Sequence, residues 1–174
     1  MYAIWNTTVH QNSSLSVIGN STVDYYMGQG PTKAFDQSRS TKHINYGVCN
    51  ATYGSSVIQC GQNTDLYLTL QRGPSLLVAF RFWTADSYPL RNPMNITIEG
   101  SNQPQSALVL GSSWTLIYSG SSGLDNDPGR LNFSPMQWLL NNTIWYFSYR
   151  LLIQTKRGGG GNFVQYSEFE LFGY

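Results

Sequence analysis

The sequence predicts an all-β fold, a sandwich or a barrel of short antiparallel strands. Apolar and polar residues alternate in several segments, which is the pattern of a strand with one buried face. Clusters of Gly, Asn, Asp and Pro separate these segments. Aromatic residues make up 14% of the chain, and no long stretch is dominated by Ala, Glu, Lys and Leu. The length of 174 residues is that of one domain with a substantial core.

Six segments are predicted strands. Segment 66–70 alternates Leu with Tyr and Thr, and 76–83 is almost continuously apolar, which is typical of a strand buried on both faces. In 94–99 the apolar residues occupy the even positions, so Asn95 faces away from the core. The other predicted strands are 114–118, 145–153 and 163–172. Because Trp83, Trp114 and Trp145 lie in predicted strands, we expect all three in the core.

Half of the fourteen asparagines lie in Asn-x-Ser/Thr sequons. Chance placement among the 33 serines and threonines predicts only about three such sequons. A sequon is used only in a secreted protein and only where its Asn faces water. We therefore expect a secreted, extracellular protein that carries N-linked glycans. The candidate acceptors are Asn6, Asn12, Asn20, Asn50, Asn95, Asn132 and Asn141.

Cys49 and Cys60 are the only cysteines, and they bracket a ten-residue segment with a turn predicted at 53–55. In a secreted protein they are expected to form a disulfide, which would stabilise the fold by about 3 kcal/mol through loop closure. Two buried free thiols are the alternative. A zinc site is not expected, because two cysteines without nearby histidines do not provide four ligands.

Residues 1–15 form an uncharged N-terminal extended segment. As a strand, this segment places Ala3, Trp5 and Val9 on one face and Asn6 and Asn12 on the other. Such a strand either pairs within its own sandwich or completes the exposed edge of a neighbouring copy. Head-to-tail strand donation does not close, so it would build a homopolymeric filament.

Charged residues are scarce. Only 11% of the chain is Asp, Glu, Lys or Arg, against roughly 25% in an average domain. The net charge of +1 gives no electrostatic footprint for nucleic acid. The longest apolar run, 76–80, is far shorter than the roughly 20 residues that span a bilayer. We expect neither a nucleic-acid partner nor a transmembrane segment.

Three stretches together resemble the discoidin-like, galactose-binding-like domains of the coagulation-factor C-type superfamily. They are Ala34-Phe35-Asp36 with Asn45-Tyr46-Gly47, Phe80-Arg81-Phe82-Trp83 leading to Gly100-Ser101-Asn102, and Tyr149-Arg150-Leu151 with the closing segment 166–173. The resemblance covers residues 16–174 and implies a jelly-roll β-sandwich of about eight antiparallel strands, the first near 16–18. It also implies an extracellular module that binds sugars, lipids or proteins through its loops. This chain departs from the coagulation-factor type, because both cysteines lie within one loop.

The resemblance further implies a structural calcium held by Asp36, Thr41 and Glu168, with backbone carbonyls completing the shell. Oxygen ligands suit such a hard cation. The alternative is an Asx-turn at Asp36 and an ordinary strand Glu168, and Gln37 stands where the family usually has Gly. The acidic cluster at 125–129 is interpreted as a turn, because no bidentate Glu follows it at calcium-loop spacing. No other cofactor is expected.

Tyr88, Arg91 and Trp138 are the candidate ligand contacts, because they lie in or near predicted loops. Asp86 and Arg91 flank Pro89, so we expect an ion pair that fixes the loop, and ligand binding by Arg91 is the alternative. His10 and His43 are the only histidines, and neither accompanies a serine or cysteine nucleophile motif. We therefore expect no enzymatic activity.

Two functions are compatible with the sequence. The first is a glycosylated extracellular structural or adhesive module that works through protein contacts and assembles with copies of itself through Ala3, Trp5 and Val9. The second is a lectin-like module that binds extracellular carbohydrate through loops at one end of the sandwich.

Overall fold

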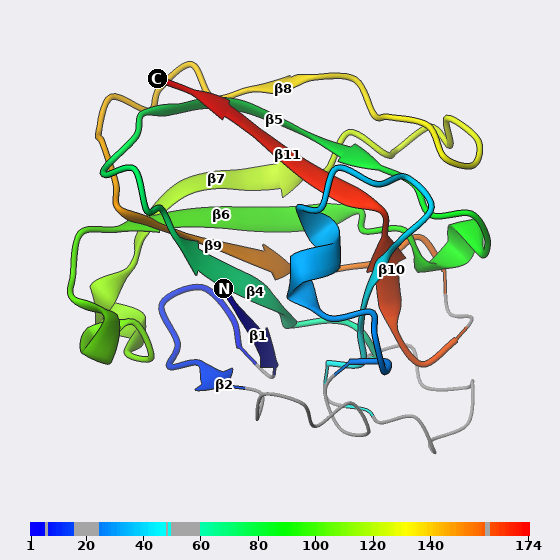
Figure 1. The fold of residues 1–174 in the computed structure, drawn as a ribbon, viewed down its shortest axis with the longest axis horizontal. Helices are drawn as coiled ribbons and strands as arrows, with labels where there is room; N and C mark the ends of the chain where they lie inside the picture. The colour runs from blue at the N-terminus through cyan, green and yellow to red at the C-terminus, as the bar shows by residue number, and fades with distance from the viewer. Residues whose placement is uncertain (6, 16–24, 48, 50–59, 159–160) are drawn as a thin grey trace.

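The computed structural model describes residues 1–5, 7–15, 25–47, 49, 60–158 and 161–174, which form three antiparallel sheets (Figure 1). The strand order is β2-β1-β4-β9-β6-β7 in the first sheet, β11-β5-β8 in the second and β10-β3 in the third. The strands are β1 Tyr2–Trp5, β2 Ser14–Leu15, β3 His43–Asn45, β4 Thr64–Thr69, β5 Leu77–Trp83, β6 Asn95–Ser101, β7 Thr115–Ser121, β8 Gln137–Trp138, β9 Ser148–Ile153, β10 Val164–Tyr166 and β11 Glu168–Gly173. Short 3-10 helices connect them: η1 Pro31–Ala34, η2 Pro89–Arg91, η3 Gln105–Ala107 and η4 Gly111–Ser113.

The first two sheets are the layers of a sandwich, and the main core lies between them (Figure 1). Of the apolar residues at even positions of 94–99, Ile96 and Ile98 are confirmed as core, whereas Met94 precedes β6 and is half-buried. Aromatic rings from β5 and β11 fill the space above them, with the Phe82 and Phe169 ring centroids 4.6 Å apart. The all-β sandwich predicted from alternation and turn spacing is therefore confirmed.

A second, smaller core covers the outer face of the six-stranded sheet. Ile4, Tyr67 and Leu152 of that sheet pack there under Leu108 and Trp114, which the η3–η4 region supplies. The expectation that β1 has a single apolar face is wrong, since Ala3 and Ile4 point to opposite faces and are both buried. The second face, which carries Ile4, is buried by Leu108 and Trp114, and both lie at least 104 residues further along the chain.

A buried ion pair accompanies this outer core. The Arg150 Nε donates to the Glu99 carboxylate at 2.5 Å, and both side chains are fully buried. Arg150 also donates to the Gln11 carbonyl and the Ser13 hydroxyl. These bonds fasten the N-terminal segment onto the sheet.

The N-terminal strand pairs within its own sandwich. Ala3 lies opposite Leu66 of β4, and Ile4 lies opposite Leu15 of β2, so β1 has partners along both edges. The structure thus shows the intramolecular alternative. Val9 lies beyond the end of β1 and is half-buried.

Two strand predictions need correction. Segment 145–153 contributes β9 only from Ser148, and Trp145 is 47% exposed rather than in the core. The reason is that the chain before β9 bonds elsewhere: the Asn102 side-chain amide donates to the Trp145 carbonyl. Segment 163–172 is split at Ser167 into β10 and β11. Trp83 and Trp114 are buried as expected.

The expected disulfide is present between Cys49 and Cys60, with their Cα atoms 5.2 Å apart. The turn predicted at 53–55 and the strand expected at 16–18 lie outside the described residues. Four sequon asparagines, Asn12, Asn95, Asn132 and Asn141, are exposed, and Asn6, Asn20 and Asn50 lie outside the described residues. Exposure permits glycosylation, which itself stays a prediction. Within the described part of the chain, no helix has the length and apolarity to cross a membrane.

Candidate functional site

A hollow of about 420 Å³, the loop-end pocket, lies where η2, β3 and β10 meet at one end of the sandwich. Its walls combine aromatic rings, cationic groups and side-chain amides. The lining residues are Tyr26, Gln29, Lys42, Ile44, Tyr46, Tyr88, Arg91, Asn162, Phe163 and Gln165. Flat apolar faces next to hydrogen-bonding groups are the combination that a sugar requires, because a sugar ring has an apolar C–H face and a rim of hydroxyls.

Arg91 is the most constrained polar group of the loop-end pocket. Its guanidinium carbon lies 4.0 Å from the Tyr88 ring centroid and 3.9 Å from that of Phe163. Burial lowers the pKa of Arg91 below its usual range. Its buried Nε has no hydrogen-bond partner among the described residues. A guanidinium held between two rings keeps its N–H edge in a fixed direction, which suits it to bind ligand oxygens.

The local sequence explains how η2 presents these side chains. Pro89 occupies the first position of the 3-10 helix, where a missing N–H is tolerated. Tyr88 before it has a φ of 53°, a left-handed conformation that is unusual for a bulky residue. The Tyr88 side chain is 57% exposed. Strained backbone at a bulky, exposed residue is more frequent at functional sites than elsewhere.

The ion pair expected between Asp86 and Arg91 is wrong. Asp86 pairs instead with Lys42, whose Nζ lies 2.7 Å from its carboxylate, and this hydrogen bond lowers the pKa of Asp86. Closeness in sequence suggested the first pairing, but η2 directs Arg91 against Phe163, 72 residues away. The loop is fixed by Lys42, and Arg91 has no acidic partner among the described residues.

The three predicted ligand contacts do not form one site. Tyr88 and Arg91 come together in the loop-end pocket, which follows the end of β5. Trp138 lies on β8 opposite Ala79, near the start of β5, and is 63% exposed. Sequence reasoning missed Phe163, which was assigned to the beginning of a strand. The only sequence feature that suggested a loop position for Phe163 was the nearby glycine-rich segment 158–161.

The predicted calcium ligands do converge. The Thr41 hydroxyl donates to the Asp36 carboxylate at 2.8 Å, and the Ser38 N–H donates to both Asp36 and Glu168, at 3.0 Å each. Gln37 has a φ of 60°, so it adopts the left-handed conformation that a Gly would provide. The loop shape implied by the resemblance is kept without the glycine.

The charges around Asp36 and Glu168 fit a cation. Burial and the nearby Asp36 carboxylate raise the pKa of Glu168 to about 7. Burial opposes ionisation of Asp36 as well, but hydrogen bonds from Thr41 and Lys33 outweigh it and lower its pKa. Among the described residues, Lys33 is the one cation that forms an ion pair with either carboxylate. Among the described residues no three His, Cys, Asp or Glu side chains form a metal cluster, so calcium would need Thr41 and backbone carbonyls.

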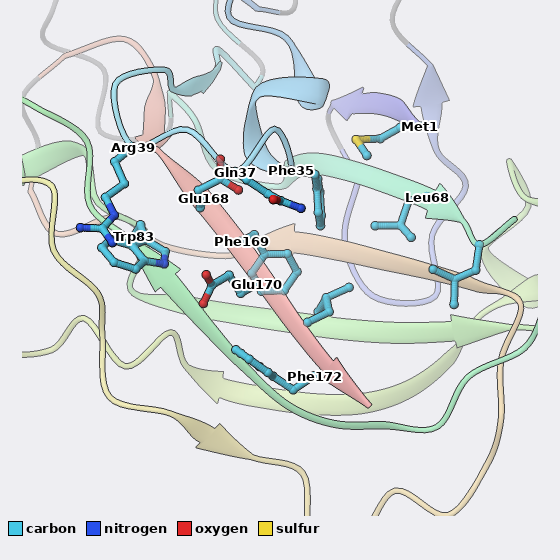
Figure 2. A pocket seen from close by; sticks show the side chains of 12 residues that line it. Met1, Phe35, Gln37, Arg39, Leu68, Trp83, Glu168, Phe169, Glu170 and Phe172 are labelled. Atoms are coloured by element: carbon cyan, nitrogen blue, oxygen red, sulfur yellow. The ribbon is translucent and has the colours of Figure 1, made fainter. Parts of the chain in front are cut away.

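A second and larger hollow, of about 560 Å³, runs beside β11 (Figure 2). Its floor is mainly apolar and includes Leu68 and Phe169. Figure 2 shows the Arg39 side chain over Trp83, where its guanidinium carbon lies 4.1 Å from the ring centroid. Its Glu170 carboxylate already pairs with Arg81. The Gln37 side chain lines the same hollow.

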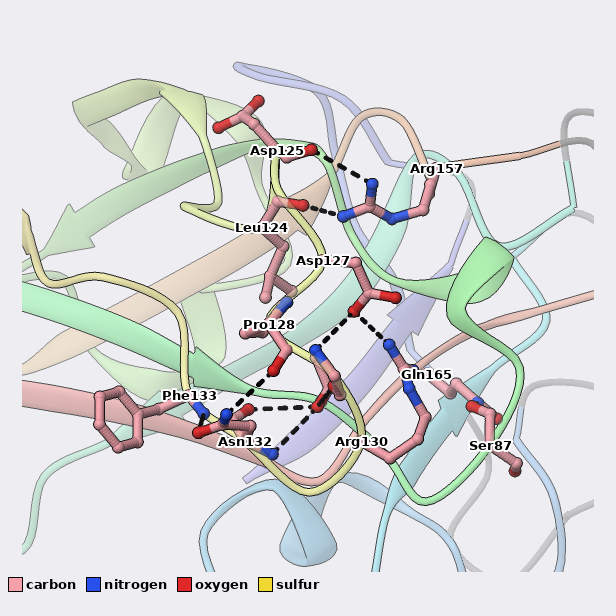
Figure 3. A network of polar contacts seen from close by, with 12 residues as sticks. Ser87, Leu124, Asp125, Asp127, Pro128, Arg130, Asn132, Phe133, Arg157 and Gln165 are labelled. Carbon is pink, nitrogen blue, oxygen red and sulfur yellow. Dashed lines mark hydrogen bonds and ion pairs between the residues drawn. The ribbon is translucent and has the colours of Figure 1, made fainter.

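The acidic cluster at 125–129 is a turn, as its sequence suggested (Figure 3). The Asp127 carboxylate accepts hydrogen bonds from the Gly129 N–H and from Arg130. Arg157 donates to the Leu124 and Asp125 carbonyls and anchors the loop. The Asp127 carboxylate is therefore used within the loop, and the Asp125 carboxylate accepts a hydrogen bond from the Ser121 hydroxyl of β7.

The buried histidine is not placed for catalysis. His43 Nε2 lies 3.1 Å from the Asp65 carboxylate, and Tyr166 donates to the same carboxylate. All three residues are fully buried. They form a buried polar cluster inside the core, in which the Asp65 carboxylate lies between His43 and Tyr166.

Neither a family model nor a curated protein sequence matches the chain. Solved structures do share its fold. Module CBM32-3 of a family 31 glycoside hydrolase from Clostridium perfringens is 14% identical, with a TM-score of 0.60 over 89% of this chain and 87% of that chain. An F5/8 type C domain from Bacteroides fragilis is 15% identical, with a TM-score of 0.57 over 82% and 80% of the two chains. The family 32 carbohydrate-binding module of C. perfringens NanJ, solved with galactose, is 12% identical, with a TM-score of 0.55 over 83% and 85%.

These neighbours have the same β-sandwich architecture that the three family-like stretches of the sequence implied. Each covers at least four fifths of both chains. The chain is therefore a discoidin-like β-sandwich with the galactose-binding-like fold.

Proposed function

We propose that the protein is a non-enzymatic carbohydrate-binding module that binds sugar in the loop-end pocket. The observation that carries this proposal is Arg91, which is held between the Tyr88 and Phe163 rings with a buried Nε that lacks a partner among the described residues. Asn162 and Gln165 line the same hollow and add amide groups. The likeness to carbohydrate-binding modules supports the proposal at the level of the fold.

The ligand class we favour is a neutral sugar of the galactose type. One structural neighbour was solved with galactose and another with GalNAc-β-1,3-galactose. The exposed Tyr88 ring offers a stacking face for the apolar side of such a sugar, and Arg91 offers N–H donors to its hydroxyls. The Lys42 charge is already paired with Asp86, so Arg91 is the cation that faces the ligand, and its N–H groups can donate to neutral hydroxyl oxygens.

A glycan array followed by titration calorimetry tests the proposal. Arg91→Ala should abolish detectable binding of the best array ligand, because it removes the donors and the cation between the two rings. Trp138→Ala is the matched control: it also removes an exposed large side chain, but one outside the pocket, and binding should be unchanged. Equal binding by wild type and Arg91→Ala, or loss of binding in Trp138→Ala alone, would reject the loop-end site.

We further propose that the module acts outside the cell and carries N-linked glycans. The Cys49–Cys60 disulfide and the exposure of all four described sequon asparagines support this location. Mass spectrometry of the native protein is the test: unmodified peptides at every sequon, together with reduced cysteines, would reject it.

Assembly into a filament stays a prediction, and nothing in the structure favours it over the lectin-like function. β1 already pairs with β2 and β4, so donation would require it to leave both strands. Light scattering of the full chain is the direct measurement. A strictly monomeric protein would eliminate assembly.

Calcium is proposed as a structural support of the module. Asp36, Thr41 and Glu168 would hold it, and its charge would neutralise the Asp36 carboxylate in the loop after η1 and the Glu168 carboxylate at the beginning of β11.

A further inference from the structure

Exposed apolar side chains are concentrated in one segment, away from the loop-end pocket. Trp138, Leu140, Ile144, Trp145 and Phe147 are each between 44% and 86% exposed, and together we call them the 138–147 patch. The segment leads from β8 into β9 at the opposite end of the sandwich (Figure 1). Five large exposed apolar residues within ten positions make a surface that is normally covered by another group.

The patch also lacks charge. Between Arg130 and Arg150 the sequence contains no Asp, Glu, Lys or Arg. A soluble surface ordinarily mixes charged residues of both signs with its apolar ones, which prevents association. Here no charged side chain within the segment can do so. The polar residues of the segment are the uncharged Asn141, Asn142 and Thr143.

The sequon Asn141-Asn142-Thr143 lies in the middle of the patch. Its turn is well anchored, since the Asn142 N–H donates to the Leu139 carbonyl at 3.1 Å and the Asn142 side-chain amide donates to the Leu77 carbonyl at 2.8 Å. Asn141 and Thr143 themselves are exposed. The position therefore combines a fixed backbone with an accessible acceptor.

The chain geometry places Asn141 close to the apolar groups. Trp138 precedes it by three residues and Trp145 follows it by four. Even a fully extended chain would keep their Cα atoms within about 14 Å of the Asn141 Cα. A glycan attached to Asn141 would thus reach both indole rings.

The other described sequons differ from Asn141. The Asn132 amide is used within its loop: it donates to the Pro128 carbonyl and accepts from the Phe133 N–H (Figure 3). The Asn12 carboxamide oxygen accepts from the Gly111 N–H. Asn95 is exposed, but its neighbour Ile96 is buried. Asn141 is the one of these four that is exposed, has exposed apolar neighbours and has no hydrogen bond to its side-chain amide within the described structure.

We propose that an N-linked glycan on Asn141 covers the 138–147 patch and is a structural part of the folded surface. The apolar faces of its sugar rings would stack on Trp138 and Trp145, and its hydroxyls would face water. The inference rests on the extracellular location proposed above. It is independent of the sugar site in the loop-end pocket.

The test compares two single-glycan deletions in the full chain, secreted from a host that performs N-glycosylation. Asn141→Gln and the control Asn95→Gln each remove one acceptor. Asn141→Gln should elute later from a hydrophobic-interaction column, raise the fluorescence of an apolar-surface dye severalfold and increase the aggregated fraction in light scattering. Asn95→Gln should match wild type. Adding Leu140→Ser and Trp145→Ser to Asn141→Gln should restore wild-type behaviour.

Three results would overturn the inference. They are an unmodified Asn141 peptide in the wild-type protein, equal behaviour of the two deletions, and a defined dimer formed by Asn141→Gln in place of aggregates, which would mark the patch as a protein interface. Sugar binding measured on the same variants separates the two proposals. Loss of the glycan effect with binding intact refutes only the covering role, and absence of binding in every variant refutes only the loop-end site.

Discussion

Aromatic side chains are exposed at both ends of the sandwich, but their surroundings differ. At the loop end, Tyr88 and Phe163 enclose a cation, and side-chain amides line the same hollow. At the other end, Trp138 and Trp145 lie in a segment without any charged residue. In our proposal, exposed rings alone do not define a sugar site. A binding site also needs fixed hydrogen-bonding groups at the edge of the rings.

The largest effect that we expect concerns the support of the loop end. Calcium at a hundred times its Kd should stabilise the fold by about 2.7 kcal/mol, because it binds the native arrangement of Asp36 and Glu168 and not the unfolded chain. Thermal unfolding with calcium or with a chelator measures this. Hydrogen exchange should slow around both carboxylates and stay unchanged in the 138–147 patch. Equal melting temperatures with and without calcium would reject the proposal that Asp36 and Glu168 bind this ion.

The same site predicts a pH dependence in calcium-free protein. The folded-state pKa of Glu168, about 7, lies above the ordinary value of 4.5, so the folded protein binds the proton more tightly than the unfolded chain does. The resulting stabilisation is fully present below pH 4.5 and is lost as the pH rises through 7. Glu168→Gln should remove this dependence. Calcium should reverse it, since the ion requires the deprotonated carboxylate.

The second prediction contrasts the two ends directly. Tyr88→Ala should weaken sugar binding by about 2 kcal/mol, or roughly thirtyfold, since it removes an exposed stacking face and one of the two rings against Arg91. Trp145→Ala removes a ring of greater area at the other end and should leave the affinity unchanged. Calorimetry with the same ligand measures both. If Trp145→Ala were the more damaging change, the sugar site would belong at the apolar end.

The third prediction uses two glycines with positive φ. At Gly161, φ is +83° and an added Cβ would lie 2.4 Å from the Arg91 Nε, so Gly161→Ala must displace that side chain. We expect a loss of affinity of about tenfold, or 1.4 kcal/mol. Gly73, at the other end, has a φ of +103° and no neighbouring atom within 4 Å of the added Cβ. Gly73→Ala therefore imposes backbone strain without moving Arg91, and only its melting temperature should fall.

Local pattern predicted the longer strands, because alternation depends on residues close in sequence, whereas the meeting of Asp36 with Glu168 came from the family resemblance. Alternation located β6, and the order of the family-like stretches brought Asp36 to Glu168. Long-range packing decided the rest. Neither Phe163 against Arg91 nor Leu108 over Ile4 can be deduced from spacing. The exposure of Trp145 was missed because the composition of an apolar segment does not reveal which residues bond to its backbone.

The smallest effect is expected at the apolar end. Trp145→Ser in unglycosylated protein should change the free energy of unfolding by no more than about 0.5 kcal/mol, because the ring is 47% exposed and gives up little packing. Urea unfolding measures the change, with the buried Trp114→Ser as a contrast that must be clearly destabilising. Solubility should rise in Trp145→Ser even though stability does not. A destabilisation comparable to that of Trp114→Ser would mean that Trp145 packs as part of the core, and the patch would then need no cover.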